Sequence, residues 1–184
     1  MLASFVFKLT RFIRIAALLP SMSRAEIRFL ESFLTKTTIV LEWGAGGSTI
    51  HFSRFVQKYY SIEHSKKWAD RITKASPPNV ALLLIPGTGN YPDYAAFNTL
   101  GDGDIADFWD YAHGFERLSE TPTVYFLDGR VRLDCLRLIS PRLRSDTKVF
   151  LHDFQRYASQ ISLEKLRVVE VVGSLALLQT SAQS

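Results

Sequence analysis

The sequence of 184 residues contains a single cysteine, Cys135, and no repeat or low-complexity tract. One cysteine excludes an intramolecular disulfide framework and any metal site built from several cysteines. Cys135 lies among the leucines of a predicted helix, so we interpret it as a packed core thiol rather than a nucleophile. The scarcity of cysteine indicates a reducing or redox-indifferent compartment.

Excess charge is also scarce outside the N-terminus. The formal net charge is +4, and the first 28 residues account for all of it, with five basic side chains against one acidic. The rest of the chain is balanced, whereas nucleic-acid binding normally requires a basic surface. We therefore expect no nucleic-acid partner and a small-molecule substrate instead.

Residues 1–22 form an N-terminal segment that precedes a single domain over residues 23–184. The segment places Lys8, Arg11 and Arg14 at three-residue spacing among apolar side chains and contains no acidic residue. Its apolar run is too short and too often charged to span a bilayer, and no small-residue cleavage site is evident. Three readings stay open: a helix docked on the domain, an organelle-targeting or membrane-surface segment, or an accident of where the chain begins. Those alternatives aside, we expect a cytoplasmic protein.

Apolar runs and helical patterns alternate along the domain. Ser23 and Glu26 form a capping-box signature, which predicts a helix to about Leu34. Continuous apolar runs bounded by turn residues predict buried parallel strands. The predicted strands are 37–43, 59–62, 80–85, 123–127 and 149–151, and the further helices are 48–56, one from 65, one or two within 86–122, 131–139 and a short one at 154–157.

The C-terminal residues break this alternation. Apolar runs at 167–172 and 175–179 are separated only by Gly173-Ser174, and so short a link demands an antiparallel hairpin. The sequence therefore predicts an α/β fold, a doubly wound and mostly parallel seven-stranded sheet with a C-terminal antiparallel hairpin and helices on both faces. Such sheets bind ligands at the carboxyl ends of their strands, near the point where the strand order reverses.

The most informative segment runs from Glu42 to Thr49 (EWGAGGST), where a predicted strand ends in a glycine turn and a helix begins. Glycines let the backbone pass close to a ligand, and the N–H groups at the helix start face a polar or anionic group. A dinucleotide fingerprint requires glycine or alanine where this chain has Thr49, and Glu42 would repel a pyrophosphate. These two residues disfavour a nucleotide-dependent oxidoreductase. Glu42 suits the amino end of S-adenosylmethionine, and Glu63, at the second strand's end, suits ribose hydroxyls.

Five segments together resemble the class I S-adenosylmethionine-dependent methyltransferases. They are E-x-G-x-G-G-S-T (42–49), Y-S-I-E-H (60–64), F-L-D-G-R (126–130), L-H-D-F (151–154) and the closing hairpin. The resemblance covers roughly residues 23–180 and implies S-adenosylmethionine as the cofactor. The cofactor-binding residues that it implies are Glu42, Gly44, Ala45, Gly46, Ser48, Glu63 and His64. One departure is Pro86-Gly87-Thr88 after the third strand, where such enzymes often carry an acidic or amide residue for the adenine.

Asp128, His152 and Asp153 follow the fourth and fifth predicted strands and are the candidate catalytic residues. Methyl transfer requires the acceptor to be placed against the methyl group and to lose its proton where it carries one. A histidine beside a carboxylate is suited to act as a base near neutral pH. We therefore expect transfer to an oxygen or nitrogen atom of a small-molecule acceptor. The alternative is a non-catalytic protein of the same fold that binds the cofactor or serves as an interaction module.

The same pattern resembles the metal-dependent, catechol-type O-methyltransferases, in which carboxylates at these two strand ends bind a divalent cation. Asp128 and Asp153 match those positions, and two carboxylates with water are able to hold Mg²⁺. That family carries a third oxygen ligand where this chain has Phe154, so we expect no metal, with Asp128 and Asp153 as the candidates if one binds. Other readings stay open: a turn after the fourth strand, a His152 without a catalytic role, and Asp153 as a helix cap. Arg130 either binds an acidic substrate or holds Asp128.

Overall fold

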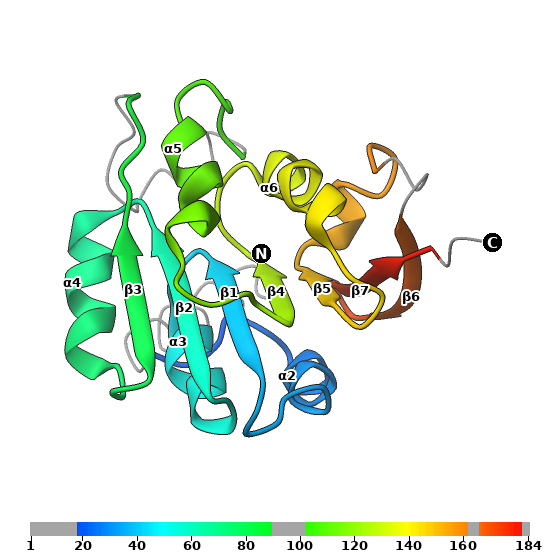
Figure 1. Ribbon diagram of the computed structural model, residues 1–184, viewed down its shortest axis with the longest axis horizontal. Helices are drawn as coiled ribbons and strands as arrows, with labels where there is room; N and C mark the ends of the chain where they lie inside the picture. Colours follow the sequence, from blue (N-terminus) through cyan, green and yellow to red (C-terminus); the bar gives the residue numbers. More distant parts are fainter. Residues whose placement is uncertain (1–17, 90–101, 162–165, 182–184) are drawn as a thin grey trace, which may run out of the picture.

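A computed structural model describes residues 18–89, 102–161 and 166–181. Seven strands form one sheet in the order β3-β2-β1-β4-β5-β7-β6 (Figure 1). The first five strands are mutually parallel, and β7 runs antiparallel to both β5 and β6. The predicted doubly wound sheet with a terminal antiparallel hairpin is therefore confirmed. The strand order reverses between β1 and β4, which is where a ligand is expected.

The predicted elements all form, with boundaries shifted by a few residues. The strands are β1 (Ile39–Trp43), β2 (Lys58–Glu63), β3 (Val80–Leu84), β4 (Val124–Leu127), β5 (Lys148–Leu151), β6 (Leu166–Val172) and β7 (Leu175–Thr180). The helices are α2 (Arg24–Glu31), α3 (Gly47–Phe52), α4 (Lys66–Ala75), α5 (Trp109–Ala112) and α6 (Arg132–Ile139). Short 3-10 turns follow α3, α5 and α6, and another, Phe154–Arg156, follows β5.

Helices cover both faces of the sheet because successive residues of a strand point to opposite faces. On one face, Leu41 and Trp43 of β1 pack with α5 and α6, and the buried Cys135 of α6 belongs to this cluster, as predicted. On the other face, Val40 packs with α2 and α3. α4 packs beside α3. None of the helices among the described residues combines the length and apolar character needed to cross a bilayer.

The predicted capping box at the start of α2 is confirmed. The Ser23 hydroxyl accepts a hydrogen bond from the Glu26 N–H, and the Glu26 carboxylate accepts one from the Ser23 N–H. α2 ends at Glu31, earlier than predicted, yet Phe33 and Leu34 still pack on the core. The apolar spacing of Phe33 and Leu34, from which a longer helix was predicted, therefore reflects their burial after the helix has ended. Most of the predicted N-terminal segment lies outside the described residues.

Candidate functional site

Two glycine turns touch where the strand order reverses. Gly44, directly after β1, has φ +96°, and a Cβ there would lie 2.7 Å from Gly129 Cα, in the turn after β4. A Cβ on Gly129 would lie 2.0 Å from the Tyr111 hydroxyl. Both positions therefore require glycine for reasons internal to the chain, since a side chain at either would separate the ends of β1 and β4.

Gly46 differs from these two glycines. Its backbone is extended, with φ −170°, a conformation open to any residue. A Cβ there would meet nothing closer than the Ser48 hydroxyl, at 3.6 Å. Neither backbone conformation nor packing among the described residues explains glycine at this position. The space in front of Gly46 is open among the described residues, apart from Ser48.

Glu42, at the end of β1, lies fully buried beneath the turn. Its carboxyl group accepts hydrogen bonds from the hydroxyls of Ser48, Thr49 (2.5 Å) and Ser61 (3.3 Å). Burial raises the pKa of Glu42 to about 8, although the hydrogen bonds from Ser48 and Thr49 oppose the shift. Glu42 and Ser48 were both predicted to hold the cofactor. In this structure they are hydrogen-bonded to each other and stabilise the glycine turn from its buried side.

Glu63, at the end of β2, is nearly fully buried and ties the turn to its neighbour. One carboxylate oxygen accepts from the Ala45 N–H (2.9 Å), and the other accepts from the N–H groups of His64 (2.9 Å) and Ser65 (2.7 Å). A carboxylate offers about four acceptor positions. Ribose hydroxyls at Glu63 would have to share it with three backbone donors.

The aromatic wall beside this turn comes from His64, from Phe108 before α5 and from Tyr111 within α5. The His64 ring stands edge-on to Phe108 and Tyr111, with ring centroids 5.6 and 6.0 Å away. Phe108 also fills the space next to Gly87, and the Thr88 N–H donates to the Asp107 carbonyl at 2.8 Å. The loop after β3 is therefore joined to the start of α5. Gly87, in the loop segment where the sequence departs from the resemblance, packs against the Phe108 ring.

Asp128 and His152 do meet at the ends of β4 and β5, as predicted. His152 Nδ1 lies 2.9 Å from Asp128 Oδ1, and its Nε2 lies 3.1 Å from the Ser174 hydroxyl, in the hairpin turn. That hydroxyl donates to Glu26 of α2 at 2.7 Å. Burial lowers the pKa of His152, but the charge and hydrogen bond of Asp128, with the charge of Asp153, outweigh it and raise the pKa above its ordinary value, although Arg132 opposes them.

Arg132, in the first turn of α6, was not singled out from the sequence, yet it joins both strand ends. Its guanidinium donates to three carbonyl oxygens, those of Asp128 (3.1 Å), Gly129 (3.0 Å) and His152 (2.7 Å). It also forms ion pairs with the carboxylates of Asp128 (3.2 Å) and Asp153 (3.1 Å). The sequence offered Arg130 as a holder of Asp128, and the structure shows Arg132 in an ion pair with that carboxylate.

Asp153 occupies the N-cap position of the short turn after β5, but its side chain makes no capping hydrogen bond there. The reading of Asp153 as a side-chain helix cap is therefore wrong. Its carboxylate pairs with Arg132 and Arg156 instead, and its backbone is left-handed, with φ +56°. Among the described residues, no group of three or more His, Cys, Asp or Glu side chains is arranged to hold a metal ion.

Sequence reasoning found the strand-end residues and missed the partners that hold them. The missed residues are Glu26, as a site partner, with Ser61, Arg132 and Ser174. From the sequence, Glu26 was identified only as part of a capping box, and Ser174 only as part of the hairpin turn. Their 148-residue separation from each other left no local signal of contact.

Comparison with known proteins supports the fold through structure rather than sequence. No model of a known protein family matches the chain, and no curated protein matches it significantly. A methyltransferase-like protein from Silicibacter pomeroyi is similar in structure, with TM-score 0.68, 23% identity and 89% of each chain covered. The chain therefore has the class I S-adenosylmethionine-dependent methyltransferase fold.

Two further solved structures share the fold at lower identity. One is a candidate methyltransferase from Streptococcus mutans in complex with SAH (TM-score 0.53, 12% identity, 87% of this chain and 100% of that chain covered). The other is precorrin 8w decarboxylase from Methanobacterium thermoautotrophicum (TM-score 0.57, 14% identity, 89% and 94% covered). The name of the second protein states a decarboxylation, which is a different reaction on the same fold. The reaction of the present chain therefore has to be argued from its own site.

Proposed function

We propose that the protein is an S-adenosylmethionine-dependent methyltransferase that acts on an oxygen or nitrogen atom of a small-molecule acceptor. The observation that carries this proposal is the open space in front of Gly46, at the turn between β1 and α3. A Cβ would fill this space, so glycine there fits a cofactor lying against the backbone. The balanced charge of the chain after residue 28 argues for a small acceptor rather than a polynucleotide.

The residues proposed to hold the cofactor are the backbone from Gly44 to Gly46 and the side chains of Glu63 and His64. When bound, S-adenosylmethionine supplies an electrophilic methyl group. The protein's part is to orient the acceptor for in-line attack and to exclude water. The two glycine turns that touch at Gly44 and Gly129 fix the ends of β1 and β4, which makes the site rigid.

Asp128, His152 and Asp153 are proposed to lie near the acceptor. Asp153 has the most exposed side chain of the three, 36% against 22% for Asp128 and 10% for His152. Asp128 is held by His152 and Arg132, and Asp153 by Arg132 and Arg156, so exposure is what distinguishes the two carboxylates. We therefore assign removal of the acceptor's proton to the Asp153 carboxylate, with Asp128 and His152 fixing the strand ends beside it.

A second candidate is a non-catalytic protein of the same fold. It is favoured by Glu63, whose carboxylate is already shared among three backbone N–H groups, and by His152, whose ring nitrogens both have partners. A protein of this kind retains the turn but has no productive acceptor site.

Calorimetric titration with S-adenosylmethionine and S-adenosylhomocysteine tests the proposal, with and without Mg²⁺. We expect micromolar binding by the wild type. In Gly46→Ala we expect affinity to fall by about tenfold or more, equal to about 1.4 kcal/mol, because the new Cβ occupies the ligand's space. The midpoint of thermal unfolding should fall only modestly, since alanine at an N-cap typically costs about 1 kcal/mol.

The other outcomes identify the alternatives. No binding by a folded wild type would overturn the cofactor assignment, and tighter binding of NADH would favour an oxidoreductase. Binding without turnover across a broad acceptor screen would favour the non-catalytic protein. A requirement for Mg²⁺ would point to Asp128 and Asp153 as its ligands.

A further inference from the structure

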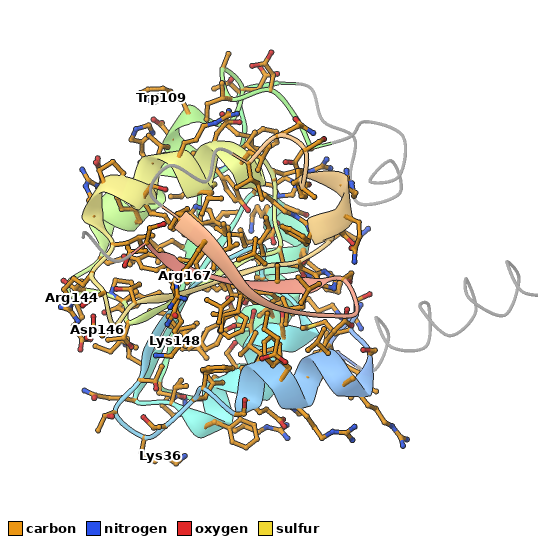
Figure 2. All side chains as sticks on the ribbon, turned by 90° about the vertical axis from the view of Figure 1, so that its right-hand side faces the viewer. Lys36, Trp109, Arg144, Asp146, Lys148 and Arg167 are labelled. Atoms are coloured by element: carbon orange, nitrogen blue, oxygen red, sulfur yellow. The ribbon has the colours of Figure 1, made fainter. Side chains whose placement is uncertain are left out.

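The strand β6 ends the sheet and has one side unpaired within the described chain. It pairs with β7 alone, and Figure 1 shows no described helix or strand outside it. Figure 2 looks onto this end of the molecule, where β6 crosses the front and Arg167 is labelled. The N–H and C=O groups along an open edge are a template for another strand.

This edge also exposes apolar surface. The valines at 169 and 171 are 42% and 43% exposed, and they are two of the six large hydrophobic side chains that are exposed in the described chain. Edge strands that stay single are usually protected by shortness, by proline, by charged side chains or by a β-bulge. β6 has seven residues and no lysine or proline, and its protection is limited to one bulge and one charge of each sign.

A β-bulge in β6 places two opposite charges on one face of the strand. Arg167 lies opposite Gln179 of β7, and Glu170 lies opposite Leu177, with Val169 as the extra residue between them. Gln179 and Leu177 are two residues apart, so their side chains share a face. Arg167 and Glu170 therefore share that face too, although they are three residues apart in sequence.

A two-fold axis through the bulge would bring these charges together across two chains. An axis perpendicular to the sheet preserves its faces, so antiparallel β6 strands would set Arg167 opposite Glu170 of the partner subunit, twice by symmetry. Without the bulge the two residues would point to opposite faces and would not meet. Both are exposed, and neither forms an ion pair with another described residue of its own chain.

We propose that a second copy of this chain pairs antiparallel with β6 about this axis, which joins the two sheets into one. Shifting the pairing by one residue in either direction would leave both charges opposite apolar residues, either Val168 and Val171 or Leu166 and Val169 of the partner subunit. The charge pattern therefore selects one register. A paired edge of seven residues buries less than the roughly 800 Å² per partner of a standard stable interface, so the dimer forms in a concentration-dependent way.

Sedimentation velocity over a concentration series tests this pairing. The wild-type mass should rise from that of one 20.9 kDa chain toward that of two. Arg167→Glu and Glu170→Arg should each raise the dissociation constant by roughly tenfold, because two attractive pairs become repulsive. The double reversal, Arg167→Glu with Glu170→Arg, should restore dimerisation, because the opposite charges face each other again with their places exchanged.

Two further variants test whether the effect on dimerisation is specific to β6. Lys74→Glu reverses an exposed charge on α4, at the other end of the sheet, and should dimerise as the wild type does. Val169→Lys should give monomers that remain folded by circular dichroism. A wild type that stays monomeric at every concentration would overturn the proposal. Single reversals that dimerise normally, or a double reversal that stays monomeric, would overturn it equally.

Discussion

The protonation state of His152 follows from counting hydrogens. The Ser174 hydroxyl has one hydrogen and donates it to Glu26. Burial raises the pKa of Glu26, but hydrogen bonds from Ser174 and Ser23 outweigh it and lower the pKa, so this carboxylate only accepts. Nε2 of His152 must then donate to Ser174, while Nδ1 donates to the Asp128 carboxylate. An imidazolium satisfies every contact, and it has no lone pair to take an acceptor's proton.

Ser174→Ala removes one of the two acceptors of this imidazolium. We expect the pKa of His152 to fall, because the charged ring loses the hydrogen bond at Nε2 while its Asp128 contact remains. Heteronuclear NMR titration of the His152 ring measures the change. Ser32→Ala, which removes a hydroxyl at the other end of α2, is the matched control and should leave this pKa unaltered. An unchanged pKa in Ser174→Ala would mean that Ser174 does not hold the ring.

The raised pKa of His152 also gives protein stability a pH dependence. A group whose pKa is raised on folding contributes its full stabilisation below its unfolded pKa, about 6.5 for histidine, and loses it as pH rises through the folded value. Glu42, with a folded pKa of about 8, has the same sign. The free energy of unfolding in urea titrations should therefore decline with rising pH, from about pH 4.5 because of Glu42 and more steeply from about pH 6.5 because of His152. His152→Gln should flatten this decline, and an equally steep decline in that variant would exclude His152 as its source.

At the scale of elements, carboxyl groups at the ends of β1 and β2 hold the glycine turn by hydrogen bonds. Glu42 and Glu63 end neighbouring parallel strands, and each binds groups of the segment that follows β1. The glycine turn therefore has little side-chain packing of its own and takes its shape from hydrogen bonds to two buried carboxyl groups. Its Ala45 carbonyl also accepts a hydrogen bond from the indole of Trp68 on α4.

Glu63→Ala tests whether the turn depends on this bracing. Three backbone N–H groups would lose their acceptor, and we expect a destabilisation of about 1–3 kcal/mol in chemical unfolding. Affinity for S-adenosylhomocysteine should fall as well, because the turn loses its fixed shape. Asp70→Ala removes an exposed carboxylate on α4 as a control and should change both quantities little. A stable Glu63→Ala variant would show that the turn holds its shape without this carboxylate.

Across the whole molecule, the fold was predictable because its signals are local. Apolar runs ending in Gly44 and at Asp128 marked buried strands, and the two-residue link at Gly173-Ser174 left only a hairpin. The site was predictable only in part. Chain order and the reversal point bring Asp128 next to His152, but no local pattern shows that Arg132 reaches both strand ends. Nor does the sequence show that Glu42 faces inward, because burial depends on packing around the whole turn.

Arg132 connects more of the molecule than any other residue of the candidate site. Its contacts join the ends of β4 and β5, and its own N–H donates to Asp102 before α5 at 2.9 Å. Arg132→Met keeps most of the side-chain volume but removes one donor from two carboxylates and from three carbonyl groups. Losing one partner of a buried ion pair costs about 3–5 kcal/mol, so we expect a loss at the lower end because Asp153 is partly exposed. Arg132→Lys should recover only part of this loss, since an ammonium group does not reproduce the planar fork of a guanidinium. Urea unfolding measures both variants, and an Arg132→Met protein as stable as the wild type would show that the strand ends stay together without this arginine.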